Sequence, residues 1–170
     1  MIKIFLSALL IATTVSIYSI NIASVDNSMI SLNSYRGKKI LLVNTASASP
    51  QAVQLAQLQE LQNQLQDTVV VIAFPSNSFG NEPRSGSLLK AYMRDSLGLT
   101  FPVAERSEVT NASANMLFRW LGSKSYNGIS NAATTTDFQK FLVDGNGSLI
   151  GIFDSSVKPT SQLMLRAIRM

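Results

Sequence analysis

The chain of 170 residues contains neither cysteine nor histidine. Without a thiol it can form no disulfide, no thiolate metal site and no sulfenic acid, so thiol redox chemistry is excluded. Without an imidazole it also lacks the usual general acid–base group near neutral pH, and His-ligated zinc is excluded. We therefore expect no metal and no cofactor, although the lack of cysteine says nothing about the compartment.

Charged side chains are also scarce, at 14% of the residues, and a net charge of +4 comes from scattered lysines and arginines. No basic cluster is interleaved with aromatic residues, so we expect no nucleic-acid partner. Apolar residues reach 46%, which excludes a disordered chain. The length suits one domain with one core, and we find no internal repeat or dividing linker.

The first residues have the pattern of an export signal. Lys3 precedes a nearly continuous apolar run at 4–11, and small residues follow at 12–16. This order is typical of a secretory signal peptide, and the run is too short to span a bilayer comfortably. We predict a signal peptide at 1–15, with an uncertain end, and a periplasmic or secreted domain at 16–170 without a stable membrane span. The alternative is that this run forms a buried first strand or helix.

Two continuous apolar runs, 40–43 and 69–74, are typical of strands covered on both faces. Between them, Ser49-Pro50 predicts a helix start, because serine caps helices and proline suits the first helical position. A leucine stripe then falls on one helical face, with most of the glutamines outside it. The stripe consists of Leu55, Leu58, Leu61 and Leu65.

The rest of the chain continues the alternation of strands and helices. Parallel strands joined by right-handed crossovers fit the first half, and the turn at 144–147 predicts an antiparallel hairpin. We therefore predict an α/β protein that resembles the thioredoxin fold: three layers, α/β/α, with a mixed central sheet and helices on both faces. The further elements expected are strands at 17–23, 29–32, 101–103, 138–143 and 149–153, and helices at 87–96, 114–121 and from Pro159 onward.

Six segments, in order and with nearly the right spacing, carry a resemblance to one family. They are Leu32–Lys38, Leu42–Ser47, Leu58–Leu61, Phe74–Gly80, Thr100–Val103 and Phe138–Asp144. They are similar to LSxYKGK, xVNVAS, LQEL, FPCNQFG, TFPV and NFTKFLVD of the glutathione peroxidase family, and Glu82-Pro83 resembles its QEP. Each motif alone is weak, but their order is specific.

The same resemblance places other residue types at the reactive positions of the family. The nucleophile, a cysteine or selenocysteine, falls on Ser49, and the assisting glutamine falls on Ser78. The assisting Trp–Asn pair falls on Thr136 and Asp137, and the second cysteine of some members falls on Ser76. No catalytic residue is intact. A serine hydroxyl has a far higher pKa than a thiol and no equivalent oxidation state.

We therefore expect an inactive family member with a binding or structural role in the cell envelope, whose partner is an envelope protein or a small ligand. Ser49, Ser78, Thr136 and Asp137 would rim a polar pocket for water, an anion or a peptide backbone. For two of them a structural role is simpler, with Ser49 as a helix cap and Asp137 as a solvated charge at a loop end.

Two enzymatic alternatives remain. In the first, Ser49 is a nucleophile and a lysine is its base, with Lys38, Lys39 and Lys140 as candidates. In the second, the protein has the peroxidase activity of its family in the response to oxidative stress. The short region 121–136 resembles the smaller members of the family, which are usually monomeric and take electrons from thioredoxin, so we expect a monomer.

Overall fold

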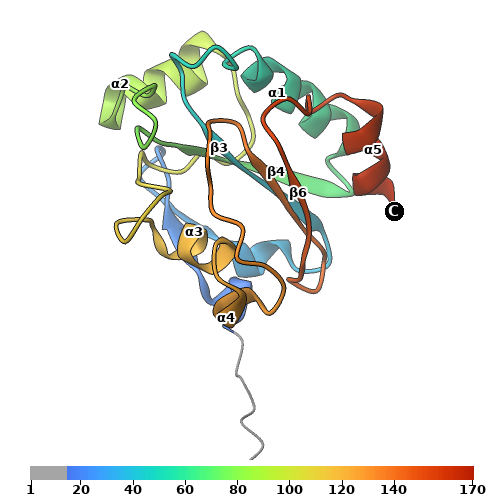
Figure 1. Ribbon diagram of the computed structural model, residues 1–170. Helices are drawn as coiled ribbons and strands as arrows, with labels where there is room; N and C mark the ends of the chain where they lie inside the picture. The colour runs from blue at the N-terminus through green and yellow to red at the C-terminus, as the bar shows by residue number, and fades with distance from the viewer. Residues whose placement is uncertain (1–14) are drawn as a thin grey trace, which may run out of the picture.

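The computed structural model describes residues 15–170, and its centre is a four-stranded sheet in the order β4-β3-β5-β6 (Figure 1). β3 (Lys39–Thr45) and β4 (Val69–Pro75) are parallel. β5 (Lys140–Val143) runs antiparallel to β3, and β6 (Leu149–Phe153) runs antiparallel to β5. The predicted mixed sheet, both apolar strands and the hairpin are thus confirmed.

β3 lies between two neighbours and is covered on both faces of the sheet. Ile40 is opposite Val70 of β4 and Val143 of β5. Because successive side chains of a strand point to opposite faces, Leu41 contributes to one buried cluster and Ile40 to the other. The domain therefore has one hydrophobic cluster on each side of the sheet.

Three helices cover the first face: α1 (Gln54–Leu65), α2 (Gly86–Ala91) and α5 (Gln162–Arg169) (Figure 1). The predicted leucine stripe of α1 packs here, with its first three members fully buried and Leu65 at the edge. Gln54, which we expected outside the stripe, is buried instead, and its Nε2 donates to the carbonyl oxygen of Ser155 at 2.8 Å.

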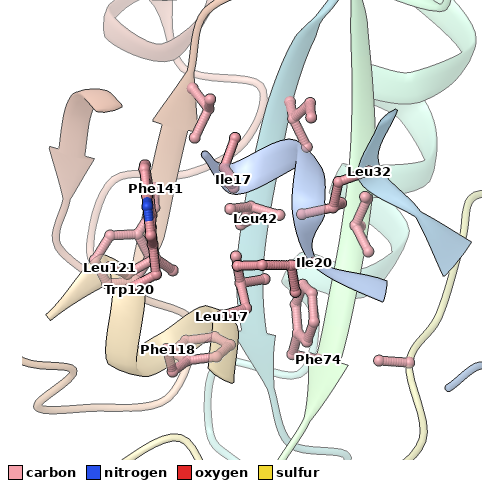
Figure 2. Close-up of a cluster of buried hydrophobic side chains, with 14 of the residues drawn as sticks. Ile17, Ile20, Leu32, Leu42, Phe74, Leu117, Phe118, Trp120, Leu121 and Phe141 are labelled. Carbon is pink, nitrogen blue, oxygen red and sulfur yellow. The ribbon is translucent and has the colours of Figure 1, made fainter. Parts of the chain in front are cut away.

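The second face is covered by α3 (Met116–Leu121) and two short turns of 3₁₀-helix, η1 (Ile17–Ser19) and η2 (Leu32–Tyr35). The short helix α4 (Lys124–Asn127) contacts α3. Figure 2 shows the aromatic centre of this cluster. The ring of Phe118 lies edge-on to Phe74, with 5.3 Å between centroids, and edge-on to Phe141, with 6.1 Å. Helices on both faces confirm the predicted three-layer arrangement.

A second, two-stranded sheet pairs β1 (Asn21–Ala23) with β2 (Met29–Ser31), and here the prediction of longer strands was wrong. Residues 17–19 form η1 because the hydroxyl of Ser16 accepts a hydrogen bond from the N–H of Tyr18 at 3.3 Å. Residue 32 belongs to η2 rather than to the strand. Residues 17–19 and residue 32 are therefore in 3₁₀-helix, although the apolar pattern predicted strands there.

Several predicted starts also move by a few residues. α1 begins at Gln54 instead of Pro50, because residues 50–53 form turns. α3 begins after Asn115, whose side chain caps Phe118 N–H, and α5 begins after Ser161 rather than at Pro159. β5 begins at residue 140 because Phe138 has a φ of 60°, which is not strand geometry.

The helix predicted at 87–96 is present as α2 followed directly by the π-helix η3 (Tyr92–Ser96). Across residues 15–170, no helix is long and apolar enough to cross a membrane. The predicted signal peptide falls almost wholly on residues 1–14, which lie outside the described part of the chain.

Candidate functional site

Ser49 lies in the turn that leads from β3 to α1 and is 7% exposed. Its Oγ accepts a hydrogen bond from the N–H of Gln51 at 3.3 Å, as the capping hypothesis predicted. Its carbonyl oxygen accepts from Ala52 N–H at 2.9 Å. Because α1 starts only at Gln54, Ser49 caps the lead-in turn and not the first turn of the helix.

Asp137 is only 4% exposed, so its prediction as a solvated loop charge was wrong. Its Oδ2 accepts from the Nδ2 of Asn81 at 2.7 Å, whereas its Oδ1 is buried with no hydrogen-bond partner among residues 15–170. The carbonyl oxygen of Asn81 in turn accepts from Ala48 N–H at 2.9 Å. Asp137 is thereby connected to the Ser49 turn through one intermediate residue.

Thr136 contributes its backbone to this region. Its carbonyl oxygen accepts from the Nδ2 of Asn44, at the end of β3, at 2.9 Å. The carbonyl oxygen of Asn44 accepts from Phe138 N–H at 2.8 Å. These two bonds hold the segment 136–138 against the end of β3, close to the Ser49 turn.

Ser78 belongs to a different network. Its Oγ lies 2.6 Å from Oε2 of Glu108, accepts from the N–H of Val109 at 3.0 Å and lies 3.0 Å from the Oγ of buried Ser76. A cavity of about 540 Å³ lies beside it. Of the four predicted rim residues only Ser78 lines this cavity; Ser49, Thr136 and Asp137 do not. The sequence predicted that the four residues rim one pocket, and for this cavity that prediction was wrong.

A fully buried carboxylate, Glu82, organises the turn that carries Ser49. Its Oε2 accepts from Ser47 N–H at 2.8 Å, and its Oε1 accepts from the Ser47 hydroxyl at 2.6 Å and from Arg84 N–H at 3.1 Å. The guanidinium of Arg84 donates to the Ser47 oxygen at 2.6 Å and stacks on Tyr92 at 4.1 Å. Three donors offset the desolvation of the carboxylate. Sequence reasoning noted Glu82-Pro83 as a motif but not this role.

The three lysines considered as bases for Ser49 have other partners. Lys38, Lys39 and Lys140 donate to the backbone carbonyl oxygens of residues 66, 168 and 138, at 3.1, 2.7 and 2.8 Å. Burial lowers the pKa of Lys140 to about 8, and the negative charge of Asp154 partly opposes this effect. Within residues 15–170 no lysine is hydrogen-bonded to Ser49, so a preformed Ser–Lys dyad is absent.

The chemistry available at this site is that of hydroxyl, amide and carboxylate groups. In the described part of the chain no three acidic side chains gather into a possible metal site. The Ser49 oxygen is held by a backbone N–H at the place where the resemblance expects a nucleophile. Such a site can bind polar groups, but it offers no side chain that cycles between a thiol and a sulfenic acid.

The fold is shared with solved structures of other proteins. The crystal structure of Trgpx in apo form has a TM-score of 0.67 and 27% identity, and the match covers 93% of this chain and 98% of that one. A thiol:disulfide interchange protein of the thioredoxin family from Chlorobium tepidum has a TM-score of 0.61 and 20% identity, with 92% and 95% covered. The domain is therefore a member of the thioredoxin-like fold class.

Sequence relatives identify the family within that class. The family model described as glutathione peroxidase matches residues 17–122. Glutathione peroxidase-like peroxiredoxin 2 of Saccharomyces cerevisiae is 31% identical over 150 residues, which cover 87% of this chain and 93% of the yeast protein. The hydroperoxy fatty acid reductase gpx1 of Synechocystis sp. is 34% identical over 151 residues, covering 85% and 89%. The chain belongs to the glutathione peroxidase family, as its motifs predicted.

Proposed function

We propose that this family member does not reduce peroxides by a thiol mechanism and acts as a binding or structural protein in an exported compartment. The observation that carries the proposal is Ser49: it stands where the family motifs place the nucleophile, and its oxygen caps a turn. No cysteine elsewhere in the chain could replace it.

The chemical argument concerns electrons. Cleavage of a peroxide O–O bond requires two electrons, which a thiolate or selenolate supplies as it becomes a sulfenic or selenenic acid. An alkoxide has no comparable oxidised state, and Ser49 also lacks a hydrogen-bonded base that would generate one. The relatives named as peroxiredoxin and hydroperoxy fatty acid reductase show which activity the scaffold supports elsewhere in the family.

The changes around Ser49 support the same proposal. Ser78 is held by Glu108 and Val109, and Asp137 places a buried carboxyl group where the resemblance expects a neutral amide. A carboxylate near the turn would disfavour an anionic nucleophile there. We expect the partner of this protein to be an envelope protein or a small ligand, in keeping with the apolar run at 4–11 that predicts export to the periplasm or the medium.

A turnover assay tests the inactivity. Purified protein is mixed with hydrogen peroxide or a lipid hydroperoxide and with thioredoxin or glutathione as reductant, and NADPH consumption is followed through the matching reductase. We expect NADPH consumption with the protein to be no faster than in a blank without it. The chain has six methionines, so a direct loss of about six equivalents of peroxide that then stops, without NADPH consumption, would be side-chain oxidation. Sustained turnover that disappears in Ser49→Ala would overturn the proposal.

A further inference from the structure

The cavity of about 540 Å³ beside Ser78 has the size of a small-molecule site, for which about 300–1,000 Å³ is usual. It is formed between segments that are far apart in the sequence: residues 78–79, residues 109–114, the helices α3 and α4, and residues 133–134. Ser49 and Asp137 do not line it. Of the four positions where the resemblance expects catalytic residues, only Ser78 lines it.

The lining combines three aromatic rings with five uncharged polar side chains, those of Ser78, Thr110, Asn111, Ser123 and Thr134. Phe79, Phe118 and Tyr126 contribute three rings, and Val109 and Ala114 add aliphatic surface. Phe118 is held by edge-on contacts with two other phenylalanines of the core (Figure 2). The N–H of Val109 is held by the Ser78 hydroxyl at 3.0 Å. An apolar ring entering this cavity would meet surfaces that are already positioned.

The charge of the lining is carried by one residue. Arg119 of α3 is the only charged residue that lines the cavity, and its guanidinium has no hydrogen bond or ion pair with residues 15–170. Tyr126 is 46% exposed and faces the same cavity, and its hydroxyl has no hydrogen-bond partner in the described chain. Glu108 is hydrogen-bonded to Ser78 and is not part of the lining. A guanidinium beside a cavity that is lined partly by aromatic rings favours an anionic group on an aromatic ligand, which it can bind with two parallel hydrogen bonds.

We propose that this cavity binds a small aromatic anion, a carboxylate or sulfonate, with its ring against Phe79 and Phe118 and its anionic group at Arg119. The inference rests on the binding role proposed above and names a ligand class for it. Apolar contact with the rings contributes to the affinity, and the single cation selects for the charge.

Fluorescence titration with 8-anilinonaphthalene-1-sulfonate tests this, because the probe is an aromatic sulfonate that brightens in apolar sites. We expect one probe per folded wild-type chain. Arg119→Gln should weaken binding roughly tenfold, the loss of one charge-assisted hydrogen-bonding group. Ala114→Phe should abolish binding by filling the cavity. Arg169→Gln, which removes the same charge from the exposed end of α5, should bind like the wild type.

A matched uncharged probe separates charge from packing. N-phenyl-1-naphthylamine has the same rings without the sulfonate, so its affinity should be equal in the wild type and Arg119→Gln. Circular dichroism confirms that each variant is folded, because unfolded or molten chains also bind these dyes. Absence of binding by the folded wild type, an unchanged affinity in Arg119→Gln, or full binding by folded Ala114→Phe would each overturn the inference.

The peroxidase assay on the same samples keeps the two proposals distinguishable. Sustained turnover would defeat the inactive role but leave a measured binding site intact. If neither probe binds and no turnover is seen, the proposed aromatic-anion site is wrong, whereas the proposal that the protein is not a peroxidase still holds.

Discussion

The Nδ2 of Asn81 donates a 2.7 Å hydrogen bond to Oδ2 of Asp137, while Oδ1 of the same carboxyl group is buried without a partner among residues 15–170. A buried carboxyl group with one unsatisfied oxygen is costly, because only one hydrogen bond from the described residues offsets its desolvation. This pair joins the segment before β5 to the loop that follows β4, beside the turn that carries Ser49.

Replacing Asp137 separates its charge from its hydrogen bond. Asp137→Asn keeps an acceptor for Asn81 and removes the buried charge, so we expect the free energy of unfolding to rise by about 1 kcal/mol at pH 7. Asp137→Ala leaves the Asn81 amide unpaired and should cost about 1–3 kcal/mol. Urea denaturation measures both. Asp95→Asn on the exposed end of η3 is the control, and an Asn variant less stable than wild type would contradict this account.

The capping role of Ser49 predicts a loss of stability and no other defect. Ser49→Ala should lower the free energy of unfolding by about 0.5–2 kcal/mol, near the lower limit because the Oγ–N distance is 3.3 Å. Ser49→Asp should be nearly neutral or mildly stabilising, because an aspartate side chain can accept the same hydrogen bond from Gln51 N–H. Ser161→Ala removes the cap of α5 and calibrates the effect. A Ser49→Ala protein as stable as wild type would rule out the capping account.

Restoring a thiol should not by itself restore peroxidase activity. Ser49→Cys places a thiol at the turn, but Ser78 stays bound to Glu108 and Asp137 stays a buried carboxyl group. A second variant carries Ser49→Cys together with Ser78→Gln, Thr136→Trp and Asp137→Asn. We expect it to turn over peroxide roughly a hundredfold faster than Ser49→Cys alone, because the effects of residues that act as a unit are non-additive. Thioredoxin-coupled turnover of both variants gives the ratio. Equal rates would show that the three other changes are unimportant.

The buried Lys140 predicts a dependence of stability on alkaline pH. Its pKa falls from the ordinary 10.5 to about 8 in the folded protein, so the unfolded chain binds the proton more tightly. The free energy of unfolding should therefore rise between pH 8 and 10.5 by up to about 3 kcal/mol from this group, and show no such slope below pH 8. Other lysines and tyrosines titrate there too, so the measured quantity is the difference in slope between wild type and Lys140→Met. Parallel curves for the two proteins would refute it.

Export predicts a shortened chain. The N–H of Val15 donates to the Tyr126 carbonyl oxygen at 3.1 Å, and the indole N–H of Trp120 donates to the Val15 carbonyl oxygen at 2.6 Å. Cleavage after Val15, at the end of the signal peptide predicted from the sequence, would leave the buried indole unpaired. We therefore now expect the cut to lie before Val15, so that the mature protein retains this residue. Mass spectrometry of protein from the native host gives the mature start, and an intact Met1 in the cytoplasmic fraction would contradict export.

Local patterns in the sequence determined much of the fold. The apolar runs at 40–43 and 69–74 became β3 and β4, the leucine stripe became the buried face of α1, and the turn at 144–147 became the hairpin. These features depend on neighbours within a few residues, which a periodicity reports directly. The ordered motifs also determined the family, and the missing cysteine determined which chemistry is excluded.

Only the tertiary structure decided the surroundings of the changed site residues. Asp137 meets Asn81 across 56 positions of the sequence, Ser78 meets Glu108 across 30, and Glu82 meets Ser47 across 35. The cavity at Arg119 likewise needs four separate segments. Burial and the pairing of polar groups depend on such long-range neighbours, which the local sequence does not reveal. The sequence pattern therefore indicated a solvated loop charge at Asp137, whereas in the folded chain its carboxyl group is buried and only one of its oxygens is hydrogen-bonded.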